Sequence, residues 1–147
     1  MVEIVIVASI IAVAFIAIIA VAQKSLQVGR QSIHVSQANF LLEEGAEAVR
    51  IARDNAWTNI SNLTLNTNYY PTFSGGTWTL STTPNTVGIF TRKVVLSAVN
   101  RNAGTGNIDP AGTLDTGTKL VTLTVSWQEG GLTKTKTILF YINDLFS

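Results

Sequence analysis

The N-terminal stretch from Ile4 to Ala22 is the longest apolar run of the chain, with no charged side chain and with Ser9 as its only polar one. At ~1.5 Å per residue, a helix over this run would measure roughly 28 Å, which is enough to cross the hydrocarbon core of a bilayer. An acidic residue, Glu3, comes directly before the run, where a carboxylate is costly unless a positive group meets it. We therefore expect residues 1–23 to form a transmembrane or filament-core helix.

Beyond this run the pattern becomes amphipathic. Apolar residues recur at helix-like spacing among polar ones, namely Leu26, Ile33, Leu41, Ala48, Val49, Ala52 and Ala56. Such spacing predicts a helix with one apolar face. Because no proline precedes Pro71, the pattern predicts one continuous helix from about Glu3 to about Trp57, roughly 80 Å long by its rise per residue. Residues 24–58 are then the amphipathic continuation of the apolar segment.

Several charged side chains of this continuation stand at spacings that bring them together on a helix surface. Glu47 precedes Arg50 by one helical turn, and Arg50 precedes Asp54 by the next. Each pair is expected to stabilise an exposed helix face by a few tenths of a kcal/mol. The only histidine of the chain, His34, falls in the same segment, and we expect it at the surface or at an interface rather than in a catalytic site.

After Trp57 the composition shifts to Thr, Asn, Ser and Gly, and residues 58–76 are predicted to form a connecting loop with at most short regular pieces. Two residues of this loop, Asn59 and Asn62, match the N-glycosylation acceptor pattern, which has a function only on an exposed loop outside the cytoplasm. Chance matches are frequent in so Asn- and Thr-rich a stretch, and that alternative stays open.

The remainder of the chain has the pattern of β-strands. Apolar residues alternate with polar ones after Lys119, with Leu123, Val125 and Trp127 on one face and Thr122, Thr124 and Ser126 on the other. Gly130 and Gly131 then supply a hairpin turn. Strands are predicted over residues 77–80, 89–99, 119–128 and 132–142. Residues 59–147 are thus expected to form a β-rich globular domain, an antiparallel sheet of three or four strands that packs on the second half of the helix, in an α+β fold.

The stretch between the second and third of these strands, residues 100–118, is predicted to be a loop rich in Gly, Asn and acidic residues. Asp109 and Asp115 could offer carboxylate oxygens to a calcium ion, whose ligands usually come from such loops. Their spacing is not that of a helix-loop-helix calcium site, and Asp and Gly are also ordinary turn residues. Calcium is therefore the less favoured of the two interpretations.

Composition removes several functional classes. The formal net charge is +1, so nothing points to electrostatic capture of nucleic acid. Cysteine is absent, which excludes disulfides and thiolate metal sites. With one histidine and no Gly-rich phosphate loop, we expect neither catalysis nor a bound cofactor.

Taken together, residues 2–11 (Val-Glu-Ile-Val-Ile-Val-Ala-Ser-Ile-Ile), the amphipathic extension of the same helix and the antiparallel sheet resemble type IV pilins and the related type II secretion pseudopilins. The stretches Thr91–Val95 and Val121–Trp127 look like the sheet of bacterial prepilin-type proteins, less specifically than the N-terminus does. In architecture the resemblance covers the whole chain.

The resemblance implies a filament subunit that waits in the cytoplasmic membrane, is cut by a prepilin peptidase, is often methylated on its new N-terminal amine, and is polymerised by the pilus assembly machinery into a homo-oligomeric surface filament. The apolar helices of such subunits form the core, and a glutamate pairs with the N-terminal amine of a neighbour. Glu3 is the matching position here. The implied assembly residues are Glu3, Met1, Ile4, Val7, Ile11 and Phe15.

This chain departs from the pattern of the family in three ways. The glutamate is third, whereas it usually lies fifth in the mature chain, and no basic leader ending in Gly precedes it. Residues 12–22 contain neither the Gly nor the Pro at which many bacterial members loosen the helix, and no Cys closes the C-terminal loop. Lys24 and Arg30 follow the apolar run, so the positive-inside rule alone would place the β-domain in the cytoplasm, opposite to pilins.

Two alternatives to a filament subunit stay open. One is a pseudopilin or minor pilin of a secretion or uptake machine. The other is an extracellular binding module that the helix merely tethers to the membrane. A tether usually breaks into a flexible linker after the membrane, whereas the helical pattern here continues, which favours the filament subunit.

Overall fold

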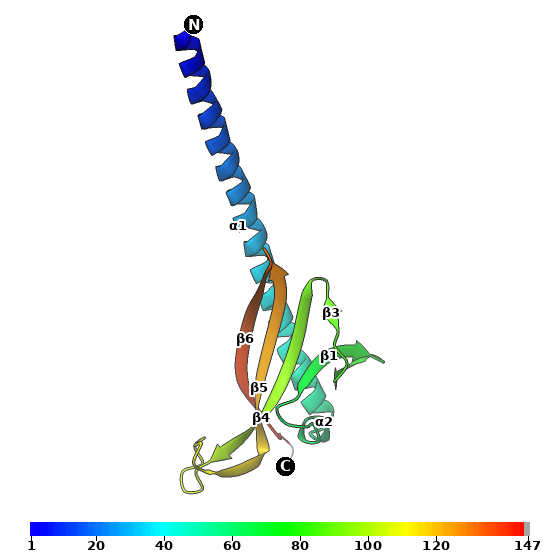
Figure 1. The fold of residues 1–147 in the computed structure, drawn as a ribbon. Helices are drawn as coiled ribbons and strands as arrows, with labels where there is room; N and C mark the ends of the chain where they lie inside the picture. The colour runs from blue at the N-terminus through cyan, green and yellow to red at the C-terminus, as the bar shows by residue number, and fades with distance from the viewer. Residues whose placement is uncertain (146–147) are drawn as a thin grey trace. The chain divides into compact units, whose positions relative to one another are not determined.

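The computed structural model describes residues 1–145 and contains two helices and six strands (Figure 1). The elements are α1 (Val2–Asn55), α2 (Thr58–Ser61), β1 (Asn68–Ser74), β2 (Thr77–Ser81), β3 (Thr86–Val87), β4 (Phe90–Arg101), β5 (Thr113–Glu129) and β6 (Leu132–Asn143). The predicted α+β class is confirmed, with one long N-terminal helix and an antiparallel sheet. The sheet has six strands, more than the three or four expected.

The chain divides into two compact units, Met1–Gln37 and Ala38–Ser147. In the first unit every residue belongs to α1 except Met1, and none is buried. Helix α1 runs without interruption through the end of the apolar segment at Ala22, as the absence of proline predicts. It ends at Asn55, two residues before the predicted end.

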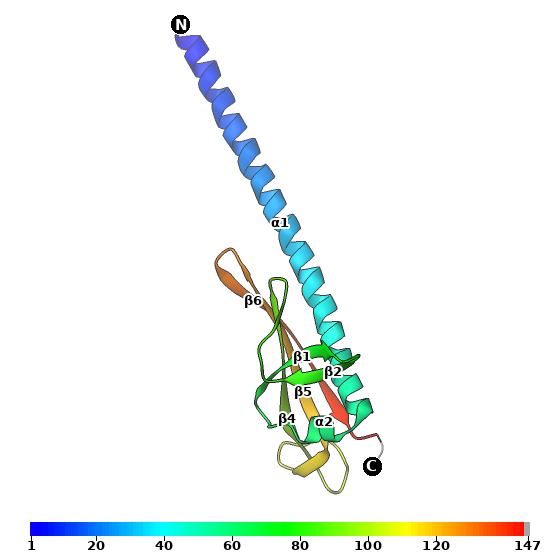
Figure 2. The same cartoon turned by 90° about the vertical axis from the view of Figure 1, so that its right-hand side faces the viewer.

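In the second unit, the last turns of α1 lie along one face of the sheet (Figure 2). The buried helix residues are small or apolar and recur every three or four positions: Ala38, Leu42, Gly45, Ala46, Ala48, Val49 and Ala52. Three of the predicted apolar positions, Ala48, Val49 and Ala52, are among them. Leu26, Ile33 and Ala56 are exposed instead, because the first two precede this packed unit and Ala56 follows the last residue of α1.

The sheet is antiparallel throughout, with the strand order β2-β1-β4-β5-β6. The short strand β3 lies outside this order and pairs with β4. Strand β6 pairs with β5 along its whole length, from Asn143 opposite Thr118 to Leu132 opposite Glu129. The predicted turn between them is confirmed, since Gly130 and Gly131 have φ of 59° and 77°. Two consecutive positive φ angles are what a two-residue hairpin turn of type I′ requires.

The core lies between the buried face of α1 and the alternating apolar residues of the two central strands, β4 and β5. As predicted, Leu123, Val125 and Trp127 are buried, while the intervening polar residues are only half-buried. The rings of Phe90 and Trp127 meet across the two strands with centroids 5.6 Å apart. Burial of such side chains on one face of a sheet supplies most of the stability of a fold of this kind.

Two predicted loops contain more regular structure than expected. Residues 58–76 include α2 and β1. Strand β1 was missed because it follows a stretch rich in Thr and Asn and contains Pro71, which is disfavoured inside strands. In the predicted loop 100–118, β4 extends to Arg101 and β5 starts at Thr113, with a register shift between Ala98 and Val99. This register shift is a β-bulge, which lets β4 and β5 stay paired beyond the point where the alternation of apolar and polar residues is broken.

Candidate assembly surface

The apolar segment of α1 is the largest exposed hydrophobic surface of the first unit. None of the 18 most apolar consecutive residues is buried, and the helix is long and apolar enough to cross a membrane. Ile4 is 73% exposed and Phe15 is 61% exposed. Side chains of this size are unfavourable in water, so the segment needs lipid or other protein chains around it.

The structure brings four of the predicted assembly residues together. Glu3, Ile4, Val7 and Ile11 lie with Ala8 on one open face of α1. These positions share a face because they are one helical turn apart or adjacent. Phe15 follows Ile11 by one further turn, and Met1 is fully exposed at the start of the chain. The set thus forms a stripe that begins at the N-terminus.

Glu3 lies in the first turn of α1. The unpaired backbone N–H groups of a helix N-terminus favour a negative charge there, so the carboxylate is compatible with the helix itself. Ser9, the other polar residue of the segment, donates its hydroxyl hydrogen bond to the Ile6 carbonyl oxygen over 2.8 Å. This bond satisfies the Ser9 hydroxyl within its own helix. In an apolar environment, the Glu3 carboxylate is therefore the side-chain group of this segment that needs a partner from outside the helix.

A second polar feature lies within the packed unit and was not predicted. Arg92 takes an inward position of β4 among buried apolar residues, and its side chain is only 3% exposed. Its Nη1 atom donates to Glu44 Oε2 over 2.6 Å and to the Leu41 carbonyl oxygen over 3.4 Å. The guanidinium also lies 5.2 Å from the centroid of the Trp78 ring. Alternation along residues 89–99 already placed Arg92 on the apolar face and could have revealed it.

This cluster links three elements of the second unit. Arg92 connects β4 to α1 through Glu44 and to β2 through Trp78. Since a buried guanidinium is stable only where its charge is met, these contacts specify one packing of helix on sheet. Its Nε atom has no hydrogen-bond partner in the described structure.

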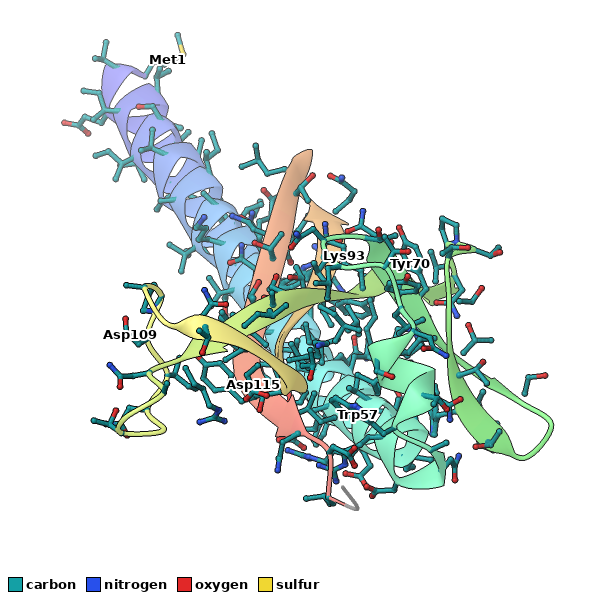
Figure 3. All side chains as sticks on the ribbon, turned by 90° about the horizontal axis from the view of Figure 1, so that it is seen from below. Met1, Trp57, Tyr70, Lys93, Asp109 and Asp115 are labelled. Carbon is teal, nitrogen blue, oxygen red and sulfur yellow. The ribbon has the colours of Figure 1, made fainter. Side chains whose placement is uncertain are left out.

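The two calcium candidates are engaged otherwise. Arg101 Nε donates to Asp115 Oδ2 over 2.6 Å, and the Gly117 amide donates to Asp115 Oδ1 over 2.9 Å. Asp109 Oδ1 accepts from the Ala111 amide over 2.9 Å in an ordinary turn. Figure 3 shows Asp109 in the loop and Asp115 at the start of β5, apart from each other. The structure therefore gives a calcium site no support.

Asp115 is the one carboxyl group with a clear electrostatic perturbation among the described residues. Hydrogen bonds from the Thr118 side chain and from Arg101 hold its pKa below the ordinary 3.8, with smaller help from Gly117 and against the effect of burial. A depressed pKa means that the ionised form is preferred in the fold. Asp115 thus anchors the start of β5 to the end of β4 through Arg101.

The two glycosylation candidates differ in their surroundings. Asn59 lies in α2, where its Nδ2 atom donates to the Ala52 carbonyl oxygen over 3.0 Å. Asn62 is the exposed C-cap residue of the same helix. A glycan on the Asn59 nitrogen would disturb its bond to Ala52, whereas Asn62 is open to solvent. His34 is half-buried within the first unit.

Among residues 1–145, no three His, Cys, Asp or Glu side chains are grouped so that they could hold a metal ion. What the molecule does offer is an exposed apolar helix face that starts with a carboxylate, on a helix whose other end is packed into a β-domain. Comparison with protein-family models, with curated proteins and with solved structures found no match for this chain.

Proposed function

We propose that this chain is a structural subunit that polymerises into a type IV pilus-like surface filament through its N-terminal apolar helix. The observation that supports it most is that two segments of α1 have different surroundings. Its apolar segment buries no side chain within the chain, while its last turns, from Ala38 onward, belong to the core of a β-domain. A helix used in this way presents one segment to other molecules and holds a folded domain with the next.

The environment of the apolar segment would change on assembly. Before assembly it lies in the membrane, which satisfies its apolar side chains. In a filament the same face contacts the helices of identical subunits. Since lipid is as apolar as leucine, this transfer gains little from hydrophobicity alone and depends on close packing and polar contacts. Small residues along the segment, such as Ala8 and Ala12, permit that close approach.

The polar contact in this proposal is made by Glu3. Its carboxylate would pair with the N-terminal amine of a neighbouring subunit. An ionised group in an apolar bundle costs several kcal/mol when it lacks a partner, so misaligned arrangements are penalised. Glu3 would therefore set the axial register of the subunits more than their overall affinity.

Two other functions remain candidates. A pseudopilin or minor pilin would use the same helix in a shorter assembly. A tethered binding module would need only a membrane anchor, and the uninterrupted course of α1 past Lys24 favours the filament subunit over that reading. The partners implied by the proposal are identical copies, the membrane before assembly, a prepilin peptidase and the pilus assembly machinery. The chain would act without catalysis or a cofactor, at the cell surface.

The proposal is tested by replacing Glu3. Filaments sheared from expressing cells are counted by electron microscopy for the unchanged chain and for Glu3→Ala, with Glu43→Ala as the matched control, because Glu43 is exposed on the same helix beyond the apolar segment. We expect filaments from the unchanged chain and the control, and few or misassembled ones from Glu3→Ala, with the β-domain still folded by circular dichroism.

A normal yield from Glu3→Ala would contradict the register role of this residue. Absence of filaments from the unchanged chain, with the protein retained in the membrane fraction, would instead favour the pseudopilin, minor pilin or tethered module. Mass spectrometry of the N-terminus of the same material would show whether the amine is trimmed or methylated.

A further inference from the structure

The second unit contains a cavity of about 430 Å³ between the end of α1, α2 and the edge strand β2. In Figures 1 and 2, α2 and the strand pair β1 and β2 lie beside the last turns of α1. A volume of this size falls in the range of small-molecule sites in proteins, roughly 300–1,000 Å³. Neither the packing of the core nor the proposed assembly surface makes use of it.

The lining of this cavity is uncharged and combines polar side chains with apolar ones such as Leu63 and Leu80. Hydrogen-bonding side chains come from both sides of it, namely Asn55, Thr58 and Asn59 from the helices and Thr77 and Thr79 from β2. All of its described lining residues are uncharged. A charged ligand would find no counter-charge here, so the chemistry favours a neutral ligand that carries several hydroxyl or amide groups.

The two amides are held in place by hydrogen bonds of their own. Asn55 Nδ2 donates to Thr77 Oγ1 over 2.9 Å, which joins α1 to β2 across the cavity. Asn59 Nδ2 donates to the Ala52 carbonyl oxygen over 3.0 Å. Side chains that are fixed before a ligand arrives lose little entropy on binding, which favours recognition of a ligand with a defined pattern of hydroxyls.

Trp78 adds an aromatic surface to the same lining. Its ring is positioned by the Arg92 guanidinium, 5.2 Å from the ring centroid, and by the edge of Phe73, 5.4 Å away at 64°. The indole combines a large apolar body with one N–H donor. An aromatic ring beside amides and hydroxyls suits a sugar, because a pyranose ring has an apolar C–H face and a rim of hydroxyls.

Strand β2 is the edge of the sheet and pairs with β1 alone among the described strands. On such an edge, alternate backbone N–H and C=O groups point away from the partner strand and are open to a ligand. They would supplement the side-chain donors and acceptors on the β2 side of the cavity.

We propose that this cavity binds a neutral saccharide, with Trp78 beneath the sugar ring and with Asn55, Asn59 and the threonines around its hydroxyls. The proposal does not depend on filament assembly, because every residue in it belongs to the second unit. An extended peptide that adds to the β2 edge is the competing occupant, and the experiment separates the two.

The test uses the full chain in lipid nanodiscs or in a detergent without a sugar headgroup. Neutral hexoses, N-acetylhexosamines and their disaccharides are screened by saturation-transfer-difference NMR, and the best is titrated. We expect saturable binding in the millimolar range or tighter. Thr58→Glu introduces a charge and bulk into the lining and should weaken binding by about tenfold or more. Thr64→Glu, at an exposed position outside the lining, should leave it unchanged.

Trp78→Leu should also abolish binding, but Trp78 contacts Arg92, so its fold must be checked by circular dichroism. Thr58→Glu keeps the proposal falsifiable if Trp78→Leu does not fold. Absence of saturable binding for every sugar would overturn the proposal. Sugar binding that Thr58→Glu does not weaken would also overturn it. A third contradicting result is that the chain binds an extended threonine- and valine-rich peptide but no sugar, and that Thr58→Glu blocks the binding of this peptide.

Discussion

At the scale of single residues, the absence of one side chain sets the distance between the helix and the sheet. A Cβ atom at Gly45 would lie 2.8 Å from Arg92 Cδ and 2.9 Å from Leu123 Cδ2. Carbon atoms in contact normally stay about 3.5–4.0 Å apart. Gly45 therefore lets α1 approach the core and the Arg92 cluster closely, although glycine is a poor residue inside a helix.

Replacing this glycine should destabilise the second unit. The valine side chain of Gly45→Val would push both Arg92 and Leu123 away from α1. Overpacking of this kind lowers the free energy of unfolding by roughly 1–3 kcal/mol. Gly29→Val is the matched control, because a Cβ at Gly29 meets nothing within 4 Å. It should stay within about 0.5 kcal/mol of the unchanged chain. Thermal unfolding of the full chain, followed by circular dichroism, measures both, and an equal effect of the two substitutions would contradict this account.

The anchoring of β5 by Asp115 should make stability depend on pH. The pKa of Asp115 is depressed in the fold, so the unfolded chain takes up a proton first as the pH falls. The contribution of Asp115 is complete well above its ordinary pKa of 3.8 and is lost as the pH drops through the lower pKa of the folded state.

Asp115→Asn should therefore melt at a lower temperature than the unchanged chain at neutral pH, and the difference should shrink in acid. Melting temperatures of both chains from about pH 7 to about pH 3 test it. Arg101→Gln removes the guanidinium partner of Asp115 and should flatten the pH dependence as well. A constant difference across this range would show that Asp115 acts through packing instead of charge.

At the scale of elements, periodicity predicted those with a regular pattern. The unbroken apolar and then amphipathic run predicted α1, and strict alternation predicted the buried face of β5 around Leu123. The glycine pair at Gly130 and Gly131 predicted the hairpin. Strand β1 could not be predicted in the same way, because it pairs with β4 only at Asn68 and Tyr69 and contains Pro71, a residue that argues against a strand in the sequence.

The candidate sites divide along similar lines. The stripe that starts at Glu3 follows directly from helical spacing, since its members are neighbours in sequence. The cavity beside β2 could not be predicted, because it unites residues that are separated along the chain and meet only in the tertiary structure. Helical periodicity also cannot say where packing begins, which is why Leu26 and Ile33 were expected on a packed face and are exposed.

Strand β6 needs protection because it is long and lies at the edge of the sheet. Leu139 and Tyr141 are exposed on it, and an apolar edge strand is a template for aggregation. Lys134 and Lys136 occur on the same strand. Charged residues, lysine above all, are a common means of keeping an edge from pairing with another chain.

Removing these charges should promote aggregation of the purified chain. Lys134→Thr combined with Lys136→Thr keeps β-propensity while deleting both lysines. We expect faster growth of light scattering and of thioflavin fluorescence than in the control Lys93→Thr, since Lys93 lies on the central strand β4. Equal rates for the two variants would show that β6 is protected by some other means.

At the scale of the whole molecule, stability and proposed assembly belong to different parts of the chain. Every buried residue of the described structure lies at Ala38 or beyond, and the unit Met1–Gln37 contributes none. The apolar segment is therefore not needed to hold the β-domain together.

A chain that starts at Lys24 should accordingly stay folded and become soluble. It retains the whole core, so its melting temperature should lie within a few degrees of that of the full chain, and it should sediment as a monomer in analytical ultracentrifugation. Loss of cooperative unfolding in this truncated chain would show that the apolar segment stabilises the domain after all.

The uninterrupted course of α1 also has a mechanical consequence. No flexible linker between the apolar segment and the packed turns can extend under load, so tension applied at the N-terminus reaches the contacts of Ala38–Ala52 with the sheet directly. The chain has no cysteine to reinforce those contacts covalently. Resistance to pulling would then rest on the packing of the buried residues of α1 against the sheet, together with the close fit at Gly45 and the Glu44–Arg92 ion pair, and the domain should yield as one cooperative rupture instead of a gradual lengthening.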